Sequence, residues 1–188
     1  MIAVVLGVRA GRLEVSLRRV ERTRGETLEA ALARTADVEA LAYVEQLDTR
    51  LLADGTLATS YLGLLPADAA APPTNGVADE DAVELVRAAR ARLRAKLSYT
   101  NVGFALAPET FTISELRDIY VAALGYDVSA TNLQRVLVRR GVLERVEGRR
   151  APGRSGGRPA ALFRFKSRQL EITDEFAALR PRGSRASG

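Results

Sequence analysis

The 188-residue chain contains no cysteine and no histidine. Without cysteine it can form no disulfide bond, and without either residue type it can form no zinc site built from Cys and His. The lack of histidine also excludes a catalytic triad that uses His, as well as histidine-based general acid–base catalysis. Any bound metal would therefore have to be a hard cation held by carboxylates.

Long apolar runs and aromatic residues are also scarce. No stretch is long enough to span a membrane, and the apolar start of the chain lacks the basic flank and the cleavage site of a signal peptide. Only 5% of the residues are aromatic, and they show no pattern suited to stacking single-stranded bases. With 47% hydrophobic and 27% charged residues, the composition is that of a soluble globular protein. We expect a cytoplasmic protein without a membrane partner.

The net charge of +5 is unevenly distributed along the chain. Residues 1–80 hold 8 Arg and Lys against 12 Asp and Glu, which gives −4, whereas the remainder holds 20 against 11, which gives +9. A one-sided positive field suits a polyanionic partner. The alternative is the ordinary surface of an arginine-rich protein, because only two of the basic residues are lysines.

Residues 112–141 are predicted to form two helices joined by a short turn. Thr112 and Glu115 have the spacing of a capping box, and Gly125 suits a left-handed helix end. Ser129 can cap the second helix, which ends before Gly141. Apolar residues recur at helical spacing in both helices: Leu116, Ile119, Tyr120, Ala123 and Leu124 in the first, and Leu133, Val136 and Leu137 in the second.

The opposite face of the second helix carries side chains that can read bases in a major groove. Arginine pairs with guanine through two hydrogen bonds, and asparagine or glutamine pairs with adenine in the same way. A helix-turn-helix places its second helix in that groove. We predict that bases are read by Thr131, Gln134, Arg135 and Arg139, with Asn132 beside them; Val138 lies on the same face.

Two predicted strands follow, over residues 142–146 and 160–165, and residues 147–159 join them. This connection is rich in glycine and carries the arginines Arg149, Arg150, Arg154 and Arg158. A basic hairpin tip of this kind is typical of a wing that lies along a phosphate backbone or in a minor groove. The alternative is a solvated loop on an ordinary α+β domain. The order of helix, turn, helix and basic wing favours a winged helix-turn-helix that binds double-stranded DNA.

The N-terminal part is predicted to form strands around one helix. The expected strands cover residues 2–9, 13–20, 44–52 and 57–65, and the expected helix covers residues 27–42. Asp54-Gly55 between two such strands is a strong hairpin signal. We predict an α+β protein with a small mixed domain over residues 1–67, a linker over 68–80, a linker helix and winged helix over 81–170, and a partly disordered tail over 171–188.

Short motifs between residues 90 and 165 occur in the order found in one known family. They lie at residues 92–93, 96–100, 104–108, 111–116, 120, 124–125, 132–135, 157–160 and 163–165. This stretch resembles the C-terminal domain of the Nudix-related transcriptional regulators, the NrtR family. That family carries an N-terminal Nudix domain, and residues 43–49 and 58–66 resemble two of its strands. The resemblance implies a small Nudix-like domain in front of the winged helix.

The Nudix box is where the sequence departs from the family. Setting Glu26 on the first glutamate of the box places Arg34 and Glu39 on matching positions. Thr35 and Val38 then stand where two of the three metal-binding glutamates belong. Those glutamates hold magnesium beside a pyrophosphate and help to activate water. We therefore predict no catalytic residue, no metal site and no bound cofactor, and the alternative for the remaining charges is a solvated helix face with local ion pairs.

The resemblance implies a DNA-binding regulator of NAD-related or nucleotide-metabolism genes, usually a repressor, with ADP-ribose or a related nucleotide as effector. The degenerate Nudix-like domain would then serve dimer formation or effector sensing. We also expect a homodimer, because palindromic operators are read by two-fold dimers. Two alternatives stay open: an ADP-ribose-type Nudix hydrolase, and a non-catalytic module that binds RNA or a protein.

Overall fold

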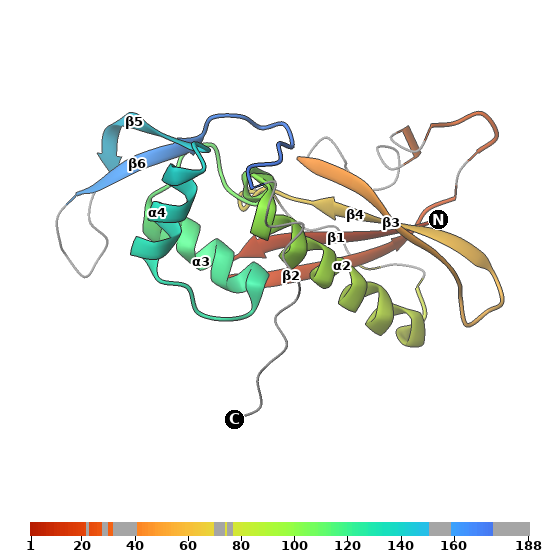
Figure 1. Cartoon of the computed structure of the whole chain (residues 1–188). Helices are drawn as coiled ribbons and strands as arrows, with labels where there is room; N and C mark the ends of the chain where they lie inside the picture. The colour runs from red at the N-terminus through yellow and green to blue at the C-terminus, as the bar shows by residue number, and fades with distance from the viewer. Residues whose placement is uncertain are drawn as a thin grey trace, which may run out of the picture.

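The computed structural model describes residues 1–21, 23–27, 30–31, 41–69, 74, 77–150 and 159–174. In this part of the chain, a four-stranded sheet and a two-stranded sheet lie at opposite ends of the molecule, and helices pack against both (Figure 1). The predicted α+β class is confirmed. No helix of the described residues combines the length and the apolar character needed to cross a bilayer.

The N-terminal sheet has the strand order β2-β1-β4-β3. Its strands are β1 (Ile2–Arg9), β2 (Arg12–Arg19), β3 (Tyr43–Leu51) and β4 (Leu57–Leu64), each within one residue of its predicted range. β1 and β2 form an antiparallel hairpin, as do β3 and β4, whereas β1 and β4 pair in parallel. Ala10 and Gly11 both have positive φ, as a two-residue type I′ turn requires.

Both faces of β1 are buried. Ile2, Val4 and Leu6 point into the large core on the side of the helices. Ala3 and Val5 point to the other face, where a smaller cluster includes Val20, Ala31 and Leu65. A central strand with both faces covered reads as a continuous apolar run, which explains the sequence of β1. Only Ala30 and Ala31 of the helix expected over residues 27–42 are described as helical, and most of that range lies outside the described residues.

Helix α2 (Asp79–Tyr99) lies across the sheet (Figure 1). It buries Leu85, Ala89, Leu93 and Leu97, one residue per turn, against the core. Three acidic residues occupy its first turn, where their negative charges interact favourably with the positive end of the helix dipole. The predicted helix covered residues 81–97, so α2 is two residues longer at each end than predicted.

Polar contacts also hold α2 to the sheet. Lys96 Nζ lies 3.0 Å from Glu45 Oε2 on β3, and both side chains are largely buried. Arg50 Nη1 lies 3.0 Å from Glu84 Oε2. These pairs fix α2 against β3 at two points along its length.

The C-terminal half has the order of a winged helix. Its elements are η2 (Val102–Ala105), α3 (Ile113–Leu124), α4 (Ala130–Arg139), β5 (Leu143–Arg150) and β6 (Ala160–Phe165). Phe111 pairs with Phe163 through two backbone hydrogen bonds of 2.9 and 2.8 Å, so a single residue adds to the edge of β6. The rings of Phe111 and Phe165 lie 5.5 Å apart and close the core beneath the wing.

One continuous cluster of buried side chains joins the two halves. It contains Leu6 and Leu62 of the sheet, Leu93 of α2, and Phe104 and Phe165 of the winged helix. The N-terminal sheet and the winged helix therefore share a hydrophobic core.

The segment after β6 is also bound to the rest of the fold. Ile172 forms a β-bridge with Thr100, and the amide of Asn101 donates to Gln169 O at 2.8 Å. Thr173 N donates to Tyr99 O at 2.8 Å. Residues 171–174, which were predicted to begin the tail, are thus bound at the end of α2, and residues 175–188 lie outside the described part.

Candidate DNA interface

The start of α3 is fixed by the predicted capping box. Thr112 Oγ1 accepts a hydrogen bond from Glu115 N at 3.2 Å, and Glu115 Oε2 accepts one from Thr112 N at 2.7 Å. Gly125 ends the helix with a φ of 75°, in the left-handed region. Both ends of α3 are therefore set by local sequence, and the turn that leads to α4 begins at a defined place.

α4 is held by its buried face. Ser129 Oγ accepts a hydrogen bond from Asn132 N at 3.4 Å at the start of the helix, as predicted. Leu133 and Leu137 are 5% and 1% exposed and pack into the shared core. Gly141 has a φ of 69° and turns the chain into β5. This packing leaves the opposite face of α4 outside the core.

The outer face of α4 carries the side chains predicted to read bases. Thr131, Arg135 and Arg139 are exposed, and Gln134 is half-buried. Arg135 Nη2 donates to Asn132 Oδ1 at 2.9 Å, so these two side chains are oriented by each other. All five predicted residues on α4 are thus at the surface or its margin, with donors and acceptors suited to base edges.

Arg140 differs from its neighbour Arg139. Its guanidinium donates to Leu97 O at 3.4 Å and to Ser98 O, and it lies 3.7 Å from the carboxylate of Asp174. The last carbonyls of a helix carry partial negative charge, so a guanidinium is stabilised there. Arg140 therefore ties the end of α4 to the end of α2. No role was predicted for Arg140, because only its contacts with α2 and with Asp174 distinguish it from Arg139.

The wing begins farther along the chain than predicted. β5 extends to Arg150, and the pairing with β6 shifts register between Val146 and Arg149, with Gly148 at a φ of 100°. Residues 147–150, which were expected in the loop, are thus strand residues that continue beyond a bulge. The bulge was not predictable from the glycine alone, because it depends on the partner strand.

The four predicted wing arginines have different settings. Arg149 is exposed, and no ion pair holds it within the described chain. Arg150 Nη1 lies 3.0 Å from Glu115 Oε1, and Arg150 Nη2 donates to Thr110 O at 3.4 Å, so this side chain is turned toward the start of α3. Arg154 and Arg158 lie outside the described residues.

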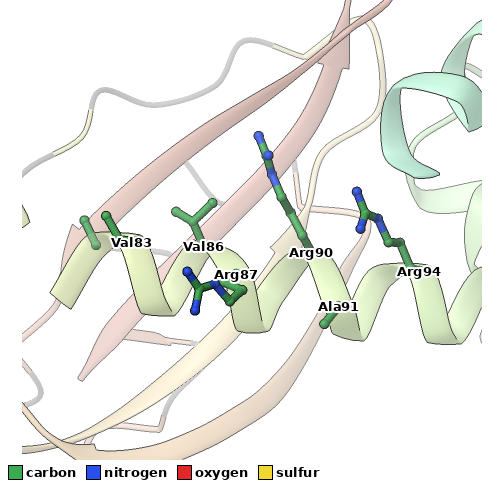
Figure 2. Close-up of a pocket in the computed structure, with 7 residues that line it drawn as sticks. Val83, Val86, Arg87, Arg90, Ala91 and Arg94 are labelled. Atoms are coloured by element: carbon green, nitrogen blue, oxygen red, sulfur yellow. The ribbon is translucent and has the colours of Figure 1, made fainter. Parts of the chain in front are cut away.

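A second basic surface lies on the exposed face of α2. A groove of about 580 Å³ is lined there by Ala82, Val83, Val86, Arg87, Arg90, Ala91 and Arg94. Figure 2 shows these side chains on successive turns of α2. All residues that line this groove belong to α2, and none belongs to α4 or to the wing. In Figure 1, α2 lies apart from β5 and β6. Arg87 and Val83 are therefore an exposed arginine and an exposed valine that lie outside the candidate interface.

Glu26 was predicted to align with the first glutamate of a Nudix box. Glu26 Oε2 accepts hydrogen bonds from Thr23 N at 2.9 Å and Thr23 Oγ1 at 2.8 Å, so it closes a local turn. Arg34, Thr35 and Glu39 lie outside the described residues. Across the residues that the structure describes, no group of acidic side chains could hold a metal ion.

A largely buried ion pair lies at the junction between β3 and α2. Lys96 Nζ lies 5.5 Å above the ring centre of Tyr43 and 3.0 Å from Glu45. Burial opposes the charge on Lys96, but its contacts with Tyr43 and Glu45 raise its pKa overall. Burial also raises the pKa of Tyr43. Lys96 is therefore charged at neutral pH. Its ion pair with Glu45 is a contact within the fold.

Comparison with known proteins agrees with this geometry. Residues 103–165 match the NrtR DNA-binding winged helix domain. The ADPR responsive transcriptional repressor NtrR of Acinetobacter baylyi is 35% identical over 82 residues, which are 44% of this chain and 32% of that protein. The matched stretch thus spans about a third of the length of this curated relative.

Solved structures extend the likeness to most of the chain. The crystal structure of Shewanella oneidensis NrtR complexed with a 27mer DNA has a TM-score of 0.67 and 25% identity, and the match covers 87% of this chain and 91% of that chain. A MutT/nudix family protein from Enterococcus faecalis has a TM-score of 0.59 at 17% identity, over 88% of each chain, and shows the same fold.

The fold and the match together define a class: a Nudix-like region followed by a winged helix of the DNA-binding type. Within this class, residues 103–165 carry the NrtR type of winged helix, and the chain is similar to NrtR proteins. The resemblance that the sequence motifs indicated is confirmed.

Proposed function

We propose that the protein is a sequence-specific, DNA-binding transcriptional repressor of NAD-related or nucleotide-metabolism genes. α4 enters the major groove of a duplex operator, and the wing contacts the phosphate backbone or the minor groove. The protein works in the cytoplasm as a homodimer on a two-fold operator.

The observation that carries this proposal is the outer face of α4. That face is free of the core, presents arginine, asparagine and glutamine side chains, and belongs to a domain of the NrtR DNA-binding type. The related Shewanella oneidensis protein has been crystallised with DNA. The positive charge of the C-terminal half supports the same partner, because phosphate contacts supply much of the affinity for DNA.

The Nudix-like half is proposed to sense an effector without hydrolysing it. Thr35 and Val38 replace two carboxylates of the Nudix box, and Glu26 is bound to Thr23. The name of the Acinetobacter baylyi relative supports ADP-ribose, or a related nucleotide, as the effector. We expect no magnesium-dependent release of AMP from ADP-ribose; turnover at rates typical of enzymes would overturn this part of the proposal.

Fluorescence anisotropy tests the DNA-binding proposal. The purified protein is titrated onto duplex DNA from upstream of its own operon and onto a scrambled duplex, at near-physiological salt. Arg135→Ala should reduce the preference between the two duplexes, because Arg135 reads a base. Arg149→Ala should weaken binding to both and flatten the salt dependence, because Arg149 meets a phosphate. Arg87→Ala, on the α2 groove, should change neither.

The outcomes separate the parts of the proposal. Equal affinity of the wild type for both duplexes, together with no enrichment from a random duplex library, would refute sequence-specific binding. Equal losses on both duplexes for Arg135→Ala and Arg149→Ala would refute the division between reading and backbone contacts. ADP-ribose should release the bound operator, and two chains should bind each duplex in multi-angle light scattering.

A further inference from the structure

Val138 is an apolar side chain on the outer face of α4. It is 52% exposed, whereas Leu133 and Leu137 of the same helix are buried. Valine is also a weaker helix former than the arginine, glutamine or lysine residues that commonly occupy exposed helix positions. Neither the core nor the stability of α4 therefore accounts for a valine here.

The position of Val138 on α4 completes a reading face. Thr131, Gln134, Arg135 and Val138 occupy positions i, i+3, i+4 and i+7, which lie together on one side of a helix. A helix laid in the major groove can read bases through four positions with this spacing. Three of these residues have polar groups for base edges, and Val138 offers only an isopropyl group.

The major groove contains one apolar group that such a side chain can contact. Among the four ordinary bases, thymine alone presents a methyl group there, on C5. We propose that Val138 is a specificity-determining residue that packs against the C5 methyl group of a thymine. This inference rests on the proposed function, because it assumes that α4 lies in the major groove.

The same geometry locates the thymine relative to the base that Arg135 reads. Three residues of α4 span about 4.5 Å along the helix axis, a little more than one base step of about 3.4 Å. The thymine therefore lies one or two base pairs from the guanine contacted by Arg135. The half-site contains a guanine and a thymine at this spacing, on the same or on opposite strands.

The experiment removes the two methyl-bearing partners separately. The preferred duplex is first obtained by selection from a random library with the wild-type protein. Each thymine in it is then replaced by deoxyuridine, which lacks only the C5 methyl group. Binding is measured by anisotropy for the wild type, for Val138→Ala and for Val83→Ala, which makes the same change at a 60% exposed position on α2.

At one thymine per half-site, deoxyuridine should weaken wild-type binding about fourfold, the effect of one buried methyl-sized group. The same replacement should have no effect on Val138→Ala and should keep its full effect on Val83→Ala. The inference is wrong if no thymine shows this dependence. It is also wrong if replacing that thymine by deoxyuridine weakens binding of Val138→Ala as much as it weakens binding of the wild type. Failure to select any sequence would instead refute the proposed function. Unchanged melting temperatures of both variants would exclude misfolding as the cause.

Discussion

Adjacent arginines at the end of α4 offer a test of how that helix is held. Arg139 is exposed, whereas the side chain of Arg140 is 13% exposed and bonds to the last carbonyls of α2. Methionine at either position keeps much of the aliphatic stem and removes the charge. Arg140→Met should therefore destabilise the protein, and Arg139→Met should not.

The magnitude follows from the contacts that are lost. A hydrogen bond from a charged donor contributes about 1.5–3 kcal/mol, but one of the two bonds here is long. We expect a loss of about 2–3 kcal/mol in the free energy of unfolding for Arg140→Met. For a protein of this size, that corresponds to a fall of about 4–12 °C in Tm. Arg139→Met should change the free energy of unfolding by less than about 0.5 kcal/mol.

Urea denaturation followed by circular dichroism measures both variants, and anisotropy on operator DNA measures their function. Arg139→Met should weaken DNA binding without loss of stability. A free energy of unfolding for Arg140→Met within about 0.5 kcal/mol of that for Arg139→Met would refute the contact between α4 and α2 as a source of stability.

Three further predictions concern single contacts. Arg150→Ala should weaken DNA binding less than Arg149→Ala, because Arg150 is held by Glu115, and equal losses in anisotropy would contradict this. Gly103→Ala should lower Tm, because a Cβ there would lie 2.5 Å from the Tyr120 hydroxyl, and Tyr120→Phe should recover part of the loss; a Gly103→Ala protein as stable as the wild type would show that the site adapts. Thr112→Ala removes the capping hydrogen bond and should lower the free energy of unfolding in urea denaturation by about 1 kcal/mol. An unchanged free energy of unfolding would show that water replaces the cap.

Features set by neighbouring residues could be predicted from the sequence. The capping box of Thr112, the left-handed end at Gly125 and the Ser129 cap each depend on a few residues, and all three are present. The strands of the N-terminal sheet were predicted for the same reason, since apolar runs and turn residues mark them locally.

Features set by distant residues could not be predicted. Arg139 and Arg140 are equivalent as sequence, and only the docking of α4 against α2 separates them. The ion pair of Arg150 with Glu115 joins residues 35 positions apart and requires the stem of the wing to reach the start of α3. The bulge in β5 likewise exists only through its register with β6. The base-reading residues were predicted from helical spacing and side-chain chemistry, and they stay a prediction for the experiments above.

The core shared by the sheet and the winged helix has a thermodynamic consequence. Side chains from β1 to β6 belong to one cluster, so neither half can lose its packing without exposing apolar surface of the other. The chain should unfold in one cooperative transition. A small molecule that binds only the folded N-terminal half would then raise the melting temperature of the winged helix by linkage. Candidate effectors can therefore be screened without any DNA, by following the hydrogen exchange of amides in α4.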